Sequence, residues 1–158
     1  MFGKKYVLIV FAVVFSAFVL APGAGASTGS SAATSLLQAV NQTRAAHGLQ
    51  PLRLDTNLVR AARSHSVEML RRNVFSHGDF HGRMVAFHVR GPAAGENLAW
   101  GSGSYAQPSS IVAEWLASPE HRANLLRAGW TRIGIGLARG TFLGDGGATV
   151  VTADFAGF

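Results

Sequence analysis

An export signal at the N-terminus sets the first limit on how this chain can fold. Lys4 and Lys5 precede an apolar run over residues 6–20, and the small residues Ala24-Gly25-Ala26 follow it. A basic start, a short apolar stretch and an A-x-A site form the layout of a secretory signal peptide. The alternative is a retained membrane anchor, although the apolar run is short for a membrane span. We therefore expect residues 1–26 to be removed after Ala26 and the mature chain to be secreted.

The mature chain must form its core without covalent crosslinks. The sequence has 158 residues and no cysteine, and removing 26 of them leaves 132. A domain of that size buries about two-thirds of its unfolded surface, so packing can hold it together. Secreted domains often carry disulfides, so export without cysteine favours a bacterial source over an animal one. We expect residues 27–33 to be a flexible leader and residues 34–158 to be one domain, with no membrane span after cleavage.

The mature chain is mildly basic. Both lysines lie in the export signal, which leaves 12 arginines against 8 acidic residues, a net charge of +4. The arginines are spread along the sequence without the dense basic stripe or motif that nucleic-acid binding requires, so no nucleic-acid partner is expected. A basic exported protein can lie against anionic wall polymers, and the alternative is an ordinary solvated surface.

The hydrophobic pattern predicts helices, an extended segment, more helices and a final β-hairpin. Helices are expected over residues 34–47, 55–73, 108–117 and 119–126. Extended segments are expected over residues 50–54, 95–100, 133–137 and 148–155, with a turn at 144–147, while 84–89 fits either state. This order indicates an α+β fold with an antiparallel sheet. The glycines of the last two strands imply close backbone approach.

His65 is predicted to be a core residue rather than a ligand. It shares one face of the second helix with the apolar residues Leu58, Ala61 and Met69. We expect a buried imidazole that is hydrogen-bonded to backbone.

Three other residues could carry chemistry. His77 lies in a loop beside glycines, His121 follows Ser118-Pro119, and Glu96 lies in an apolar stretch. A carboxylate in such a setting needs a partner, because burying it unpaired is costly. Two imidazoles suit zinc or another divalent cation, and a neighbouring carboxylate can fix a histidine tautomer. We interpret His81 as an ordinary loop residue.

Other catalytic templates fit the sequence poorly. No cysteine is available as a nucleophile, and G-x-S-x-G, H-E-x-x-H, P-loop and dinucleotide-binding motifs are all missing from the sequence. Ser118 and His121 could form a serine–histidine pair. Ser118 precedes Pro119, however, so we interpret it as a helix N-cap.

Four segments in this order also point to a known family. They are Asn41-Gln42-Thr43-Arg44 with residues 48–54, Phe75-Ser76-His77, Gly95-Glu96-Asn97-Leu98-Ala99-Trp100, and Trp115-x-x-Ser118-Pro119-x-His121-Arg122-x-Asn124-Leu125-Leu126 followed by Ile133-Gly134-Ile135-Gly136. With them the sequence resembles the CAP superfamily of cysteine-rich secretory, antigen 5 and pathogenesis-related proteins, also called SCP-like extracellular proteins. The resemblance covers about residues 36–158 and is greatest to the compact bacterial branch.

The resemblance implies a three-layer α-β-α sandwich with a central antiparallel sheet and a surface cleft lined by histidines and acids. His77 and His121 match the two cleft histidines, and Glu96 matches the first cleft glutamate. The second glutamate of animal members falls at Ser118 here, and Glu114 is the candidate to replace it. Because this second glutamate is missing, a mechanism that uses two histidines and two glutamates is in doubt. The metal site formed by the two histidines does not depend on it.

Three functions stay open at this point. The favoured one is a secreted, non-catalytic binding module for an extracellular or cell-wall ligand, with Zn²⁺ or another divalent cation held by His77 and His121. The first alternative is a metal-dependent hydrolase of peptides, wall polymers or lipids, with Glu96 and the two histidines as candidate catalytic residues. The second is a carrier of apolar ligands, for which the only marks are aromatics that we interpret as core: Phe80, Phe87 and Trp100.

Overall fold

The computed structural model describes residues 28–157, with side chains from residue 31 onward, so the predicted export signal lies outside this range. In the described range no helix is long and apolar enough to cross a membrane. The elements in chain order are α1 (Thr28–Ala46), β1 (Arg53–Leu54), α2 (Thr56–Arg72), α3 (Phe80–Ala86), β2 (Ala93–Gly101), the 3-10 helix η1 (Gly103–Ala106), α4 (Pro108–Ala117), α5 (Pro119–Leu125), β3 (Trp130–Phe142) and β4 (Asp145–Gly157).

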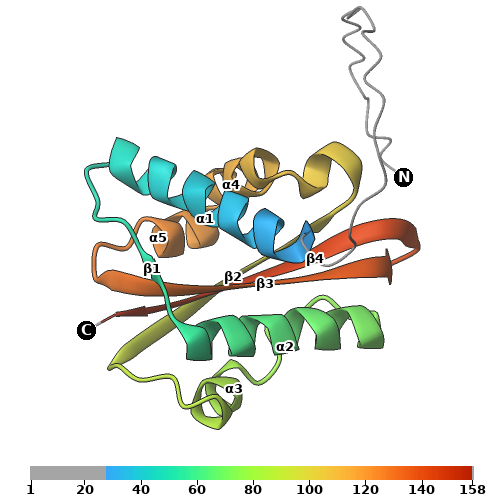
Figure 1. Ribbon diagram of the computed structural model, residues 1–158, viewed down its shortest axis with the longest axis horizontal. Coiled ribbons are helices and arrows are strands. Elements are labelled where there is room, and N and C mark those ends of the chain that lie inside the picture. Colours follow the sequence, from blue (N-terminus) through green and yellow to red (C-terminus); the bar gives the residue numbers. More distant parts are fainter. Residues whose placement is uncertain (1–27, 158) are drawn as a thin grey trace, which may run out of the picture.

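The elements form three layers. The four strands follow the order β1-β3-β4-β2, with α1, α4 and α5 on one face of the sheet and α2 and α3 on the other (Figure 1). This arrangement confirms the predicted α-β-α sandwich. The sheet is antiparallel from β3 through β4 to β2, but β1 pairs with β3 in parallel. The short link after α1 thus adds a parallel edge strand that the predicted antiparallel sheet did not include.

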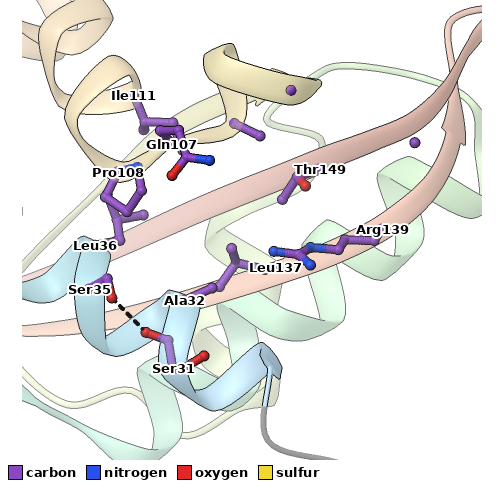
Figure 2. A pocket seen from close by; sticks show the side chains of 13 residues that line it. Ser31, Ala32, Ser35, Leu36, Gln107, Pro108, Ile111, Leu137, Arg139 and Thr149 are labelled. Atoms are coloured by element: carbon purple, nitrogen blue, oxygen red, sulfur yellow. Dashed lines mark hydrogen bonds between the residues drawn. The ribbon is translucent and has the colours of Figure 1, made fainter. Parts of the chain in front are cut away.

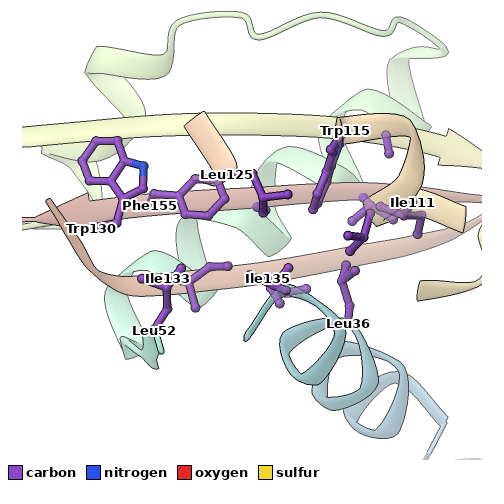
Figure 3. Close-up of a cluster of buried hydrophobic side chains, with 14 residues drawn as sticks. Leu36, Leu52, Ile111, Trp115, Leu125, Trp130, Ile133, Ile135 and Phe155 are labelled. Atoms are coloured by element: carbon purple, nitrogen blue, oxygen red, sulfur yellow. The ribbon is translucent and has the colours of Figure 1, made fainter. Parts of the chain in front are cut away.

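The largest core cluster fills the space between the sheet and helices α1, α4 and α5 (Figure 3). Trp115 of α4 is 1% exposed, and its indole N–H donates to the carbonyl of Leu98 on β2 at 2.9 Å. Full burial of a large apolar side chain stabilises a fold by about 1.5–3 kcal/mol. The other labelled members of this cluster come from all three helices, both long strands and the link before β1: Leu36, Leu52, Ile111, Leu125, Trp130, Ile133, Ile135 and Phe155.

Helix α2 lies directly against the backbone of β3. A Cβ atom added at Gly134 would lie 2.0 Å from the carbonyl carbon of Leu58, and one at Gly136 would lie 2.2 Å from that of Ala62. The predicted close approach at these glycines is therefore confirmed. The helix also has the predicted ends, because the Asp55 side chain accepts hydrogen bonds from the first turn and Asn73 adopts a left-handed conformation.

Two expectations about local structure are wrong. Helix α1 begins at Thr28, so residues 28–33 of the expected leader are helical. The Ser35 hydroxyl donates to the carbonyl of Ser31 at 2.9 Å, and Ala33 packs against the core, which extends the helix toward the N-terminus. The hairpin turn is also shorter than predicted, because Leu143 and Gly144 both have positive φ, 49° and 87°. Two such residues fit the tight turn that joins twisted antiparallel strands, so β4 already begins at Asp145.

Candidate active site at the edge of the sheet

The edge strand β2 connects the two predicted site histidines through adjacent residues. Glu96 and Asn97 point to opposite faces of the sheet, as successive strand residues do. The Glu96 Oε1 atom lies 2.7 Å from Nδ1 of His77, and the Asn97 amide donates to the carbonyl of His121 at 3.0 Å. A further amide from Asn124 donates to Asn97 Oδ1 at 3.0 Å. We call His77, Arg83, Glu96, Asn97 and His121 the edge site.

Glu96 is buried, and both of its carboxylate oxygens are occupied. Its side chain is only 2% exposed, with Oε1 facing His77 and Oε2 accepting from the Arg83 guanidinium. Arg83 is itself almost fully buried and supplies the partner that a buried carboxylate needs. Sequence reasoning did not select Arg83. The apolar surroundings of Glu96 demanded a cation, but nothing in the sequence distinguished Arg83 from the other arginines.

A second acid lies behind Glu96 on the neighbouring strand. Asp154 of β4 is the register partner of Glu96 and is fully buried. Burial first and the charge of Glu96 second raise the pKa of Asp154 to about 9, so this carboxyl group keeps its proton at neutral pH. Sequence reasoning missed Asp154, although an acid among the apolar residues of a buried strand is the signal that could have found it.

His65 is buried as predicted and also supports the loop that carries His77. Its Nε2 atom lies 2.9 Å from the carbonyl of Ser76 and 3.9 Å from Glu96 Oε2. Burial lowers the pKa of His65 more than the nearby Glu96 raises it, so the ring is neutral and donates to Ser76. The bond to backbone is the predicted one, and the proximity of His65 to Glu96 is an addition from the structure.

His121 lies half-buried on α5 across the edge strand. Burial lowers the pKa of His121, and positive charge on His77 lowers it further, while Glu120 and Glu114 act in the opposite direction. The neutral ring therefore has a free nitrogen lone pair at neutral pH.

The metal ligands expected at this site are two histidines. Among the described residues no three His, Cys, Asp or Glu side chains lie together as a set that could hold a metal ion. His77 is 57% exposed, and its Nδ1 faces a buried carboxylate, which leaves Nε2 for a ligand. A carboxylate that orients a metal-binding histidine through its other nitrogen is a common feature of metal sites.

Comparison with known proteins identifies the family. The model of the Cysteine-rich secretory protein family, or CAP, matches residues 37–155. This chain belongs to the CAP family. Two relatives come from Bacillus subtilis. The uncharacterized protein YkwD is 34% identical, and the match covers 64% of this chain and 40% of the relative. The uncharacterized membrane protein YlbC is 35% identical, and the match covers 66% of this chain and 31% of the relative. The chain thus spans well under half the length of these curated relatives.

Solved structures agree with the fold of this CAP domain. An extracellular protein with an SCP domain from Bacillus anthracis superposes with a TM-score of 0.69 at 27% identity, covering 82% of this chain and 41% of that one. An outer surface protein from Borrelia burgdorferi has a TM-score of 0.64 at 20% identity, covering 78% and 90%. The first of these two neighbours is described as an extracellular protein and the second as an outer surface protein.

Glu114 and two residues close to His77 in the sequence, Asp79 and His81, are not part of the edge site of this CAP domain. Glu114 is exposed and influences His121 only through its charge. Asp79, the acid next to His77 in sequence, instead caps α3 by accepting from the Gly82 N–H at 2.8 Å. His81 is exposed in the same short helix.

Ser118 does not cap α5 with its side chain, contrary to the prediction. It occupies the N-cap position, but its hydroxyl lies 3.3 Å from Glu120 Oε2 and makes no capping hydrogen bond. Glu120 lies at the second position of the helix, and its carboxylate accepts from the Ser118 hydroxyl.

The hollow beside the edge site and the hollow beside α1 and α4 are each lined by polar as well as apolar residues. One, of about 480 Å³, adjoins the edge site and is lined by His65, Arg83 and Phe87 among others. The other, of about 370 Å³, lies between α1, α4 and the long strands, with Arg139 as its one charged lining residue (Figure 2). The aromatics Phe80, Phe87 and Trp100 pack against buried clusters, as expected for core residues.

Proposed function

We propose that this CAP domain is an extracellular binding module whose edge site holds a divalent cation through His77 and His121. The supporting observation is the 2.7 Å contact between buried Glu96 and Nδ1 of His77. This contact directs the Nδ1 proton to the carboxylate and leaves Nε2 of an exposed ring as a lone-pair donor. The second donor is His121, which burial keeps neutral.

The chain's own residues prepare such a site in three ways. Glu96 orients the His77 ring, and Arg83 pairs with the buried carboxylate. Asn97 fixes the backbone of His121 on the other side of the same strand. A bound zinc ion would supply a Lewis-acid centre whose open positions take water or an oxygen of the ligand.

A binding role agrees better with this geometry than catalysis does. Both oxygens of Glu96 are occupied, so no free carboxylate of the edge site is left to act as a general base. The position of the second family glutamate is Ser118, whose hydroxyl is bonded to Glu120. The metal-dependent hydrolase is the alternative proposal, with the same two histidines around the ion, and the apolar-ligand carrier is the other.

Zinc titration of the mature protein tests the proposal. We expect calorimetry on residues 27–158 to show zinc binding that His77→Ala and His121→Ala each abolish. His47→Ala is the matched control, because this histidine lies at the exposed end of α1 and should leave binding unchanged. Zinc affinity that survives both substitutions in the edge site overturns the metal assignment.

Two further assays separate binding from catalysis. Co-sedimentation with isolated bacterial cell walls should depend on zinc and on both histidines, but not on His47. Turnover of peptide, wall or lipid substrates that stops on chelation would replace the binding role with the hydrolase.

A further inference from the structure

We infer that the outward face of helix α2 is a docking surface for a linear polyanion with repeating phosphate groups. The surface consists of Arg60, Arg63 and Arg71 with Val67 between them, and all four side chains are exposed. It lies on the α2 layer and includes no residue of the edge site.

The three arginines form a line only because the chain is helical here. At about 100° per residue they fall within roughly 80° of one another, and the buried positions Leu58, His65 and Met69 lie on the opposite side of the helix. Arg60 and Arg71 are separated by about 17 Å along the helix axis at a rise of about 1.5 Å per residue. The arginines that looked dispersed in the sequence therefore form an ordered basic line.

No acid of the helix neutralises this line. Glu68 is the one acidic residue of α2, and it pairs with Arg72 at 3.0 Å, to one side of the line. Within the described residues no ion pair engages Arg60, Arg63 or Arg71, while Arg60 lies over the Phe87 ring at 5.6 Å. Arg60 and Arg63 are three positions apart, where like charges destabilise a helix, so an external anion would relieve their repulsion.

Helix α1, in the opposite layer, carries no comparable charge. Helix α1 contains a single charged residue, Arg44, and this side chain is fully buried. The exposed surface of α1 is thus uncharged, whereas that of α2 is basic. A polyanion would therefore orient this protein with α2 toward it.

The composition of the line favours a phosphate polymer over a membrane surface. Guanidinium groups bind phosphate through two parallel hydrogen bonds. A helix that lies in a bilayer interface presents aromatic and large apolar residues for insertion, and this line has only Val67. We therefore assign the surface to a phosphate polymer of the extracellular environment.

Labelled inorganic polyphosphate is the probe, and its binding to residues 27–158 is measured by fluorescence anisotropy over a salt series. The Arg63→Ser/Arg71→Ser variant should bind at least about tenfold more weakly at low salt, and the slope of log affinity against log salt should fall by about 1.5–2. The matched control is Arg122→Ser/Arg139→Ser, which removes the same charge from exposed positions outside α2 and should retain affinity within about threefold. Thermal unfolding of both variants verifies the fold.

Three results would overturn the assignment. Equal losses in the two double variants would show that net charge alone attracts the probe. Unchanged binding in the α2 variant would place the contact elsewhere. Binding to phosphatidylglycerol vesicles without binding to polyphosphate would identify a membrane surface. His77→Ala and His121→Ala should not alter polyphosphate binding, so this test is independent of the edge site.

Discussion

Glu96 and Asp154 lie directly opposite each other on β2 and β4, and both carboxyl groups are buried. Arg83 is the one arginine that pairs with Glu96 in the described part of the chain. One positive charge can compensate one carboxylate, and the second acid therefore retains its proton. The edge site thus rests on a buried carboxyl pair that costs stability to maintain.

Asp154→Asn should make the folded state more stable at neutral pH. The pKa of Asp154 is about 9 in the folded protein and about 4 in an unfolded chain. The stability associated with its proton is complete below about pH 4 and is lost progressively as pH rises toward 9. Asparagine removes this loss, so we expect a gain of about 1–3 kcal/mol at pH 7 and a flatter pH profile in urea unfolding. Parallel pH profiles for the two proteins would contradict this, and Asp145→Asn is the control.

Gly136→Ala should destabilise the fold strongly. The added methyl group would lie 2.2–2.3 Å from backbone atoms of Ala62 and Arg63, which cannot move without lifting α2 from the sheet. We expect a loss of about 3 kcal/mol or more in urea unfolding. Gly146→Ala is the control, because a Cβ atom there meets nothing within 4 Å. A tolerated alanine at position 136 would show that α2 does not approach β3 as closely as described.

Arg44→Lys should loosen the junction of α1 with the segment after α5. The fully buried Arg44 guanidinium donates to the carbonyls of Gln50 at 3.1 Å, Leu125 at 2.8 Å and Arg127 at 3.1 Å. A lysine ammonium cannot reproduce this fork, so buried carbonyls lose their donors. We expect a cost of about 3 kcal/mol in urea unfolding. The substitution Arg122→Lys, at an exposed position, should cost under about 0.5 kcal/mol. Equal effects of the two substitutions would contradict a stabilising role for the hydrogen bonds of Arg44.

Glu96→Gln should weaken both the fold and zinc binding. Arg83 would lose its counter-charge in a buried position, at a cost of about 3–5 kcal/mol. His77 would lose the carboxylate that orients its ring, and zinc affinity should fall about 10–100-fold. Calorimetry and urea unfolding measure the two effects. Glu114→Gln, on the exposed surface, should change stability and zinc affinity only slightly. If Glu114→Gln had the larger effect of the two variants, Glu114 would be the functional acid.

Local patterns in the sequence predicted most of the secondary structure. Spacing of apolar residues located α2, and Asp55 and Asn73 marked its two ends because capping depends on neighbouring residues alone. Pro108 and Pro119 marked the starts of α4 and α5 in the same way. The same local reasoning predicted the start of α1 wrongly, because its small first residues are helical with the support of Ala33, which packs against the core.

The sequence by itself pointed to His77, Glu96 and His121 as candidate site residues, and the resemblance selected the same three. Only the tertiary structure decided which residues contact them. Arg83 and Asp154 reach Glu96 from another helix and another strand, and Asn97 reaches His121 across the sheet edge. Such contacts depend on strand order and helix placement, which minimise the free energy of the whole domain rather than of any local segment. The basic line on α2 arises in the same way, because the helix has to turn its apolar side to the sheet before its arginines can align.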